Sequence, residues 1–93
     1  MKVGVCQLSL LETQDLMTDK HLVQRLKQKI FERFKIPIIQ VKDSALFDGL
    51  VIGFAVVANE EDFVRSTIDK IEAFIEESEG LRVSRDKIQV LSY

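Results

Sequence analysis

The opening residues alternate between two faces, which is the pattern of a β-strand. From Lys2 to Leu10, one side carries Gly4, Cys6, Leu8 and Leu10, and the other carries Val3, Val5, Gln7 and Ser9. Both sides are partly apolar, so we expect this strand in the middle of a sheet. The uninterrupted apolar run from Leu50 to Ala58 predicts a second strand that is covered on both faces.

Two other segments repeat apolar residues at the three-and-four spacing of a helix. The first is expected from about Leu16 to Phe34, with Asp15 or Thr18 as its N-cap. The second is expected to follow Asn59 as its N-cap and to end at Gly80, which can turn left-handed. The predicted buried stripes are Leu22, Val23, Leu26, Ile30, Phe31 and Phe34 in the first helix, and Phe63, Val64, Ile68, Ile71, Phe74 and Ile75 in the second.

Pro37 helps to place the remaining strands. It ends the first helix at Ile36, and because it lacks an N–H, the β-rich run from Ile38 to Val41 belongs at a sheet edge. Residues 43–49 read as a connection, and a last strand is expected near Lys87 to Leu91. The order β-α-β-β-α-β predicts an α+β, ferredoxin-like sandwich, in which a four-stranded antiparallel sheet carries both helices on one face and the first and third strands are central.

Composition narrows the class of protein. The 93 residues, 46% hydrophobic, are expected to form one domain over residues 1–93. Thirteen Lys and Arg against fifteen Asp and Glu give a formal net charge of −2, so no DNA partner is expected. The longest apolar run is too short to span a bilayer and the start lacks a secretory pattern. We therefore expect a cytoplasmic protein without a membrane partner.

Few side chains suit catalysis or metal binding. One Cys, one His and no Trp exclude a disulfide framework and a Cys/His zinc site built from one chain. Cys6 lies in an apolar strand, and His21 has no recognisable catalytic neighbours. Asp43 and Asp48 flank a turn, where aspartate is favoured by local hydrogen bonds to the backbone. We expect no enzyme, no cofactor and no metal.

Charge is divided unevenly between the two predicted helices. Residues 15–35 carry six basic and three acidic side chains, whereas residues 60–79 carry eight acidic and two basic ones. Helices of opposite sign are expected to lie side by side. Arg25, Lys29 and Arg33 follow one another at i, i+4 and i+8. This stripe is either a solvated helix face or a weak, salt-sensitive contact for ribosomal RNA phosphates or an acidic protein.

The sheet face opposite the helices is also apolar. If Ile52, Phe54 and Val56 pack under the helices, their neighbours on the third strand face away, beside those of the first strand. Because monomers rarely expose large apolar patches, we expect a homodimer that packs sheet against sheet. In the connection, Leu46 and Phe47 either reach across the interface or are buried locally. The predicted dimer face comprises Val3, Val5, Val51, Ala55 and Val57, together with Leu46 and Phe47.

Motifs over nearly the whole chain carry a family resemblance. They are the short opening strand, a first helix ending in Glu32-Arg33-Phe34, the pair Leu46-Phe47, and the segment from Ile52 to Asn59, which is the most specific. In these motifs the sequence resembles the YlxP-like family of small uncharacterised bacterial proteins. The resemblance implies a ferredoxin-like fold. The genes of that family often lie among those for translation initiation and ribosome maturation, which implies an association with translation but no demonstrated activity.

Two functions of different class follow from the sequence. The first is a non-catalytic interaction or assembly module, homodimeric and associated with the ribosome or translation factors. The alternative is a small-ligand-binding regulatory module that uses the cleft of a dimer, which rests on analogy between folds alone.

Overall fold

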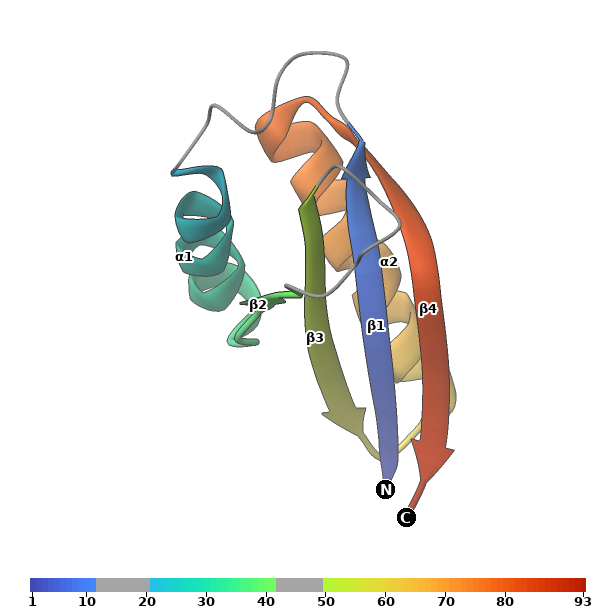
Figure 1. Ribbon diagram of the computed structural model, residues 1–93. Coiled ribbons are helices and arrows are strands. Elements are labelled where there is room, and N and C mark those ends of the chain that lie inside the picture. The colour runs from blue at the N-terminus through green and yellow to red at the C-terminus, as the bar shows by residue number, and fades with distance from the viewer. Residues whose placement is uncertain (12–20, 42–49) are drawn as a thin grey trace.

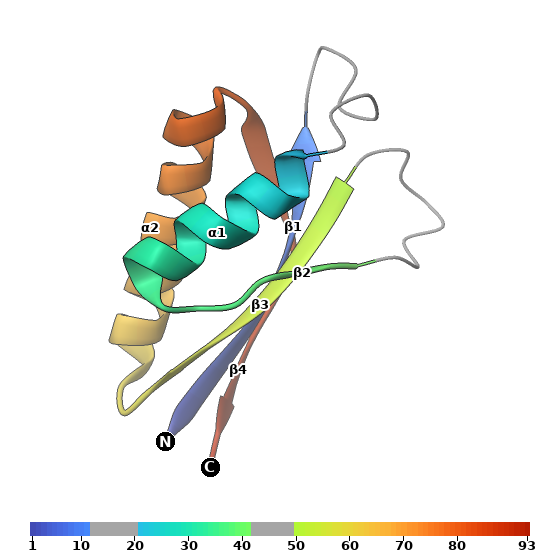
Figure 2. The same cartoon turned by 90° about the vertical axis from the view of Figure 1, so that its left-hand side faces the viewer.

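The computed structural model describes residues 1–11, 21–41 and 50–93, which form a sheet with helices on one side (Figures 1 and 2). The four strands run antiparallel in the order β2-β3-β1-β4, and Figure 2 places both helices on the same side of them. This confirms the predicted ferredoxin-like sandwich, with central first and third strands. The elements are β1 (Lys2–Leu11), α1 (Leu22–Phe34), β2 (Ile39–Gln40), β3 (Leu50–Ala58), α2 (Glu61–Glu79) and β4 (Arg82–Ser92).

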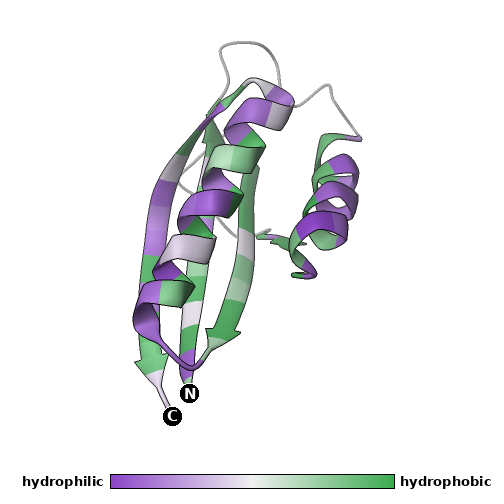
Figure 3. Ribbon diagram, turned by 180° about the vertical axis from the view of Figure 1, so that it is seen from behind, coloured by the Kyte–Doolittle hydropathy of each residue, from purple (hydrophilic) through white to green (hydrophobic). Residues whose placement is uncertain are grey.

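The register of the central strands explains where the core lies. Cys6 on β1 pairs with Phe54 on β3, and Leu8 pairs with Ile52, so the most apolar side chains of both strands share the helix side. Seen from behind, hydrophobic residues dominate the middle strands, while both helices carry hydrophilic bands on their outer faces (Figure 3). The main buried contributions of the helices are Leu22, Leu26 and Ile30 from α1 and Val64, Ile68, Ile71 and Ile75 from α2.

The helix ends differ in part from the prediction. α1 begins at Leu22, whereas Asp15 and Thr18 lie outside the described residues. The N-cap of α2 is Glu60 rather than Asn59, and its side chain makes no capping hydrogen bond. At the other end the prediction is confirmed, because Gly80 closes α2 in a left-handed conformation with φ +66° and donates its N–H to the Glu76 carbonyl.

Both buried stripes are narrower than predicted. Phe31 is 51% exposed and Phe63 is 63% exposed, so the prediction that they belong to the core is wrong. Each lies one position beside a fully buried residue, Ile30 or Val64, and one step along a helix rotates a side chain by about 100°. Phe34 and Phe74 remain half-buried, and their rings meet edge to face 5.7 Å apart.

β4 is much longer than the predicted strand from Lys87 to Leu91. Its pairing with β1 shifts between Gln7 and Leu8, because Gln7 lies opposite Lys87 and Leu8 lies opposite Arg85. One extra residue, Asp86, is therefore inserted into β4 as a bulge. The bulge reverses the alternation of side chains, so the two halves of the strand do not share one period-two pattern. The sequence pattern therefore does not reveal the first half as part of the strand.

Candidate functional site

The open face of the sheet, which looks toward the viewer in Figure 1, carries four exposed or half-buried members of the predicted dimer face. Val3 lies opposite Val57, and Val5 lies opposite Ala55, across the β1–β3 ladder. Val57 is 60% exposed, Ala55 is exposed, and the two β1 valines are half-buried. Adjacent strands thus place four apolar side chains in one surface patch, as the alternation predicted.

The other predicted members of this face are either buried or outside the described residues. Val51 shares the face but is only 3% exposed, so it offers almost no surface to a partner. Leu46 and Phe47 lie outside the described residues. A further member, which the sequence pattern does not reveal, is Ile39, which is 62% exposed and pairs with Gly53 on β3. The register of the short edge strand, rather than any local motif, brings Ile39 to the patch.

The β4 side of the open face is polar. Lys87 and Gln89 are exposed opposite Gln7 and Val5. Asp86, at the bulge, accepts a hydrogen bond from the buried Ser9 hydroxyl. The face is therefore apolar on β3 and the lower part of β1, whereas β4 adds polar and charged side chains of both signs and the half-buried Leu91 opposite Val3.

The three side chains of the predicted cation stripe contact other residues of the same chain. Arg25 donates to Glu79 of α2 at 2.6 Å, and Lys29 contacts the same carboxylate at 3.0 Å. Arg33 instead lies over the rings of Phe34 and Phe74, at 5.8 and 5.4 Å from their centroids. The stripe is therefore mainly a junction between helices of opposite charge, whose predicted adjacency these ion pairs confirm.

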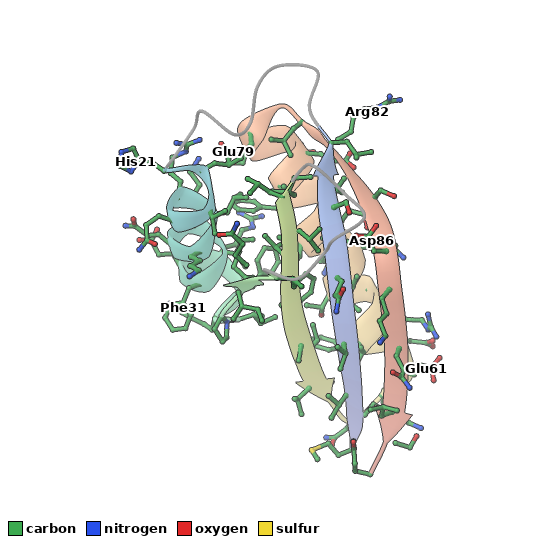
Figure 4. The ribbon with its side chains drawn as sticks, viewed as in Figure 1. His21, Phe31, Glu61, Glu79, Arg82 and Asp86 are labelled. Atoms are coloured by element: carbon green, nitrogen blue, oxygen red, sulfur yellow. The ribbon has the colours of Figure 1, made fainter. Side chains whose placement is uncertain are left out.

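Glu79 is the centre of this junction, between the upper ends of the two helices in Figure 4. Its side chain is only 7% exposed. The hydrogen bond from Arg25, followed by that from Lys29, holds the pKa of this carboxyl below its usual value despite the opposing effect of burial. α2 has no basic residue in its last turn, so the α1 cations also offset the negative end of the α2 dipole.

A second ion-pair group fastens β4 to α2. Arg85 donates to Glu72 at 2.5 Å and also to Asp69. The hydrogen bond with Glu72, followed by that with Asp69, raises the pKa of Arg85 above its ordinary value. Because the bulge at Asp86 turns Arg85 to the helix side, this contact follows directly from the shifted register.

The two residues with potential chemistry that the structure describes, Cys6 and His21, do not come together. Cys6 is buried on the helix side of β1, whereas His21 is exposed at the outer end of α1 (Figure 4). Asp43 and Asp48 lie outside the described residues. Among the residues with a described position, no three His, Cys, Asp or Glu side chains are grouped so as to hold a metal ion.

The thiol of Cys6 is expected to be inert in the folded protein. Burial raises its pKa to about 11, with a smaller opposing effect from Arg85, so the reactive thiolate is scarce at neutral pH. A disulfide reagent that releases a coloured thiol should label Cys6 in denaturant and leave it unmodified under native conditions at pH 8. Free glutathione is the control for the reagent, and rapid labelling of the native protein would contradict the expectation.

No helix in the described ranges combines the length and apolar character that crossing a membrane requires. The antiparallel order β2-β3-β1-β4 with two helices on one side defines a small α+β protein of the ferredoxin-like class. Within this class the chain belongs to the DUF503 family, described as proteins of unknown function, whose family model matches residues 2–87. No curated protein matches the sequence.

Proposed function

We propose that this protein is a non-catalytic interaction module that forms a homodimer through the open face of its sheet. The observation that carries the proposal is the patch of Val3, Val5, Ala55, Val57 and Ile39, which neither helix of the described residues covers. Burying such a patch releases water from apolar surface, the main favourable term in protein association. A two-fold axis that passes through this patch would place apolar residues of one copy on the same residues of the other.

The polar half of the face is compatible with a second copy. Lys87 and Asp86 carry opposite charges on neighbouring positions of β4. A face that bears both signs does not repel its own copy in the way that a face of one sign would. Charge is therefore no obstacle to sheet-on-sheet packing, in which two sheets approach to about 10 Å.

Replacing Val57 by aspartate is expected to convert the dimer to a monomer. Val57 is 60% exposed in the single chain, so Val57→Asp costs little in monomer stability but buries a charge in the dimer. Sedimentation velocity at micromolar concentration measures the change. Ser66→Asp adds the same charge on the exposed side of α2 and should leave the dimer intact. A wild-type protein that stays monomeric at that concentration would overturn the proposal.

The cellular setting of the module is proposed from the YlxP-like resemblance, which suggests that it acts with the ribosome or translation factors. Co-sedimentation with isolated ribosomal subunits tests this setting. Association at low salt that weakens as salt increases would support it, since contacts to RNA phosphates release counterions. Absence of association at low salt would argue against it and would leave the dimer proposal unaffected.

A further inference from the structure

Among the described residues, no strand pairs with the outer edge of β3 along its lower half. β3 runs from Leu50 to Ala58, whereas β2 has two residues, which pair with Ile52 and Gly53. The ladder extends by one more bond, from the Val41 N–H to the Val51 carbonyl at 2.8 Å. Beyond Gly53, the described part of the chain bonds to β3 on its β1 side only, which leaves the outer edge of β3 open below β2 (Figure 1).

The alternation of the strand identifies the open backbone groups. Because Val51 directs its carbonyl toward β2, odd-numbered residues of β3 direct their backbone toward this edge, and even-numbered ones toward β1. The N–H and C=O groups of Ala55 and Val57 therefore point outward. In the described ranges, neither residue has a backbone hydrogen bond on that side.

Pro37 explains why the edge stays open. If β2 continued toward α1 in the same register, Pro37 would lie opposite Ala55. Proline has no N–H to donate to the Ala55 carbonyl, so the ladder cannot be completed there. The chain leaves the sheet toward Lys35, which closes α1 in a left-handed conformation with φ 59°.

A groove runs along this open edge. Its larger part has a volume of about 560 Å³, and the lower part, about 440 Å³, shares Val57 and Phe63 with it. Phe63, exposed on the first turn of α2, forms one wall, and Phe34 and Ile36 form the other. The free backbone groups of β3 thus lie in a hollow with apolar walls rather than on a flat surface.

The larger part of the groove is positively charged. Arg33, Lys35 and Lys70 line it, and no acidic residue does so in the described part of the chain. The Lys35 ammonium lies 5.9 Å from the centre of the Phe31 ring, and Arg33 lies over Phe34 and Phe74. The rings fix the positions of Arg33 and Lys35 without neutralising their charge, so both can still attract a carboxylate from outside.

We propose that this groove binds an extended, acidic segment of a partner protein, which adds to the sheet as a strand beside β3. Main-chain hydrogen bonds to Ala55 and Val57 would supply affinity, as in other cases of strand addition. Carboxylates on the helix side would meet Lys35 and Lys70, and side chains on the other side would continue the apolar face. A second copy paired edge to edge fits less well, because it would bring the same cations of both chains together.

A synthetic peptide with alternating valine and glutamate, about ten residues long and capped at both ends, is a suitable probe because strand addition needs an extended backbone. Amide hydrogen exchange, followed by NMR during titration, reports on the edge directly. In the free protein the amides of Ala55 and Val57 should exchange faster than those of Phe54 and Val56. Bound peptide should protect the first pair and change the second pair little, since the second pair already bonds to β1.

Ala55→Pro removes one outward N–H without removing a bond to β1, so the variant should fold. We expect it to bind the peptide about tenfold more weakly. Lys35→Asn combined with Lys70→Gln should weaken binding by a similar factor and flatten its salt dependence, because asparagine tolerates the left-handed conformation at position 35. Arg82→Gln with Lys27→Gln removes the same charge from positions outside the groove and should leave binding unchanged.

Several results would overturn the proposal. These are no binding of the acidic peptide at millimolar concentration, equal binding by Ala55→Pro, or equal binding of a matched valine–lysine peptide. Protection of Ala55 and Val57 by oligouridine instead of the peptide would assign the groove to RNA. Protection that rises with protein concentration alone would assign it to a second copy. Val57→Asp keeps the backbone edge, so a failure of the proposed sheet-face dimer is detected separately by sedimentation.

Discussion

Replacing Gly4 by alanine is expected to destabilise the protein by about 2 to 3 kcal/mol, the upper part of the range for overpacking a core. A methyl group at Gly4 would lie 2.3 Å from Cγ1 of Val64, which is fully buried on α2. The valine cannot turn aside easily, because a β-branched side chain in a helix has one strongly preferred rotamer. The melting temperature should fall by about 10 to 20 °C for a domain of this size.

Two further variants test whether the close approach of α2 is the cause. Gly53→Ala places a methyl group on the open side of β3, 3.3 Å from Cγ2 of Val41, and should destabilise the protein much less than Gly4→Ala, because a shift of Val41 by a few tenths of an ångström relieves the contact. Adding Val64→Ala to Gly4→Ala frees space for the new methyl group. The double variant should therefore lose less free energy of unfolding than the sum of the losses in the two single variants. Strictly additive losses in denaturant unfolding would show that Gly4 is needed for another reason.

Glu79→Gln is expected to lower the free energy of unfolding at pH 7 by about 1 to 2 kcal/mol, the range for hydrogen bonds to charged groups, reduced because the partner cations are partly exposed. Glutamine keeps the shape and loses the charge that binds Arg25 and Lys29. The difference should depend on pH. The pKa of Glu79 is lower in the folded chain than the ordinary 4.5, so its stabilisation is complete above 4.5 and disappears as the pH falls through the folded pKa.

Urea unfolding between pH 7 and pH 3 measures this dependence. The curves of wild type and Glu79→Gln should converge in the acidic range, and a constant difference across the series would contradict the assignment. Glu76→Gln removes the same charge from an exposed position on α2 and serves as the control. Its effect should stay within about 0.5 kcal/mol, as for most exposed substitutions.

The fold could be predicted from the sequence because local and global signals agree. The alternation from Lys2 to Leu10 and the apolar run from Leu50 to Ala58 identified both central strands, and Pro37 identified the edge. The extent of β4 could not be predicted, because the bulge at Asp86 breaks the alternation that reveals a strand. The exposure of Phe63 could not be predicted for a different reason, because a large apolar residue beside a buried stripe follows nearly the same periodicity as the stripe.

The candidate surfaces were only partly visible in the sequence. Alternation alone predicted that Val3, Val5, Ala55 and Val57 would share one face, and the β1–β3 register confirms it. The partner of the cation stripe was not predictable, because Glu79 is one of eight acidic residues in residues 60–79 and only the tertiary structure buries it. Pro37 predicts that its own strand lies at the sheet edge. The same residue also leaves part of the neighbouring strand, β3, without a hydrogen-bonding partner in the described part of the chain.

The position of β1 has a consequence for how the chain folds during synthesis. β1 is made first, yet both of its neighbours, β3 and β4, come from the second half of the chain. Pairing therefore closes large loops, which slows folding relative to a protein of local contacts. Until β4 has left the ribosome, one edge of the apolar strand β1 has no partner. The nascent chain therefore needs protection from aggregation for nearly the whole time of its translation.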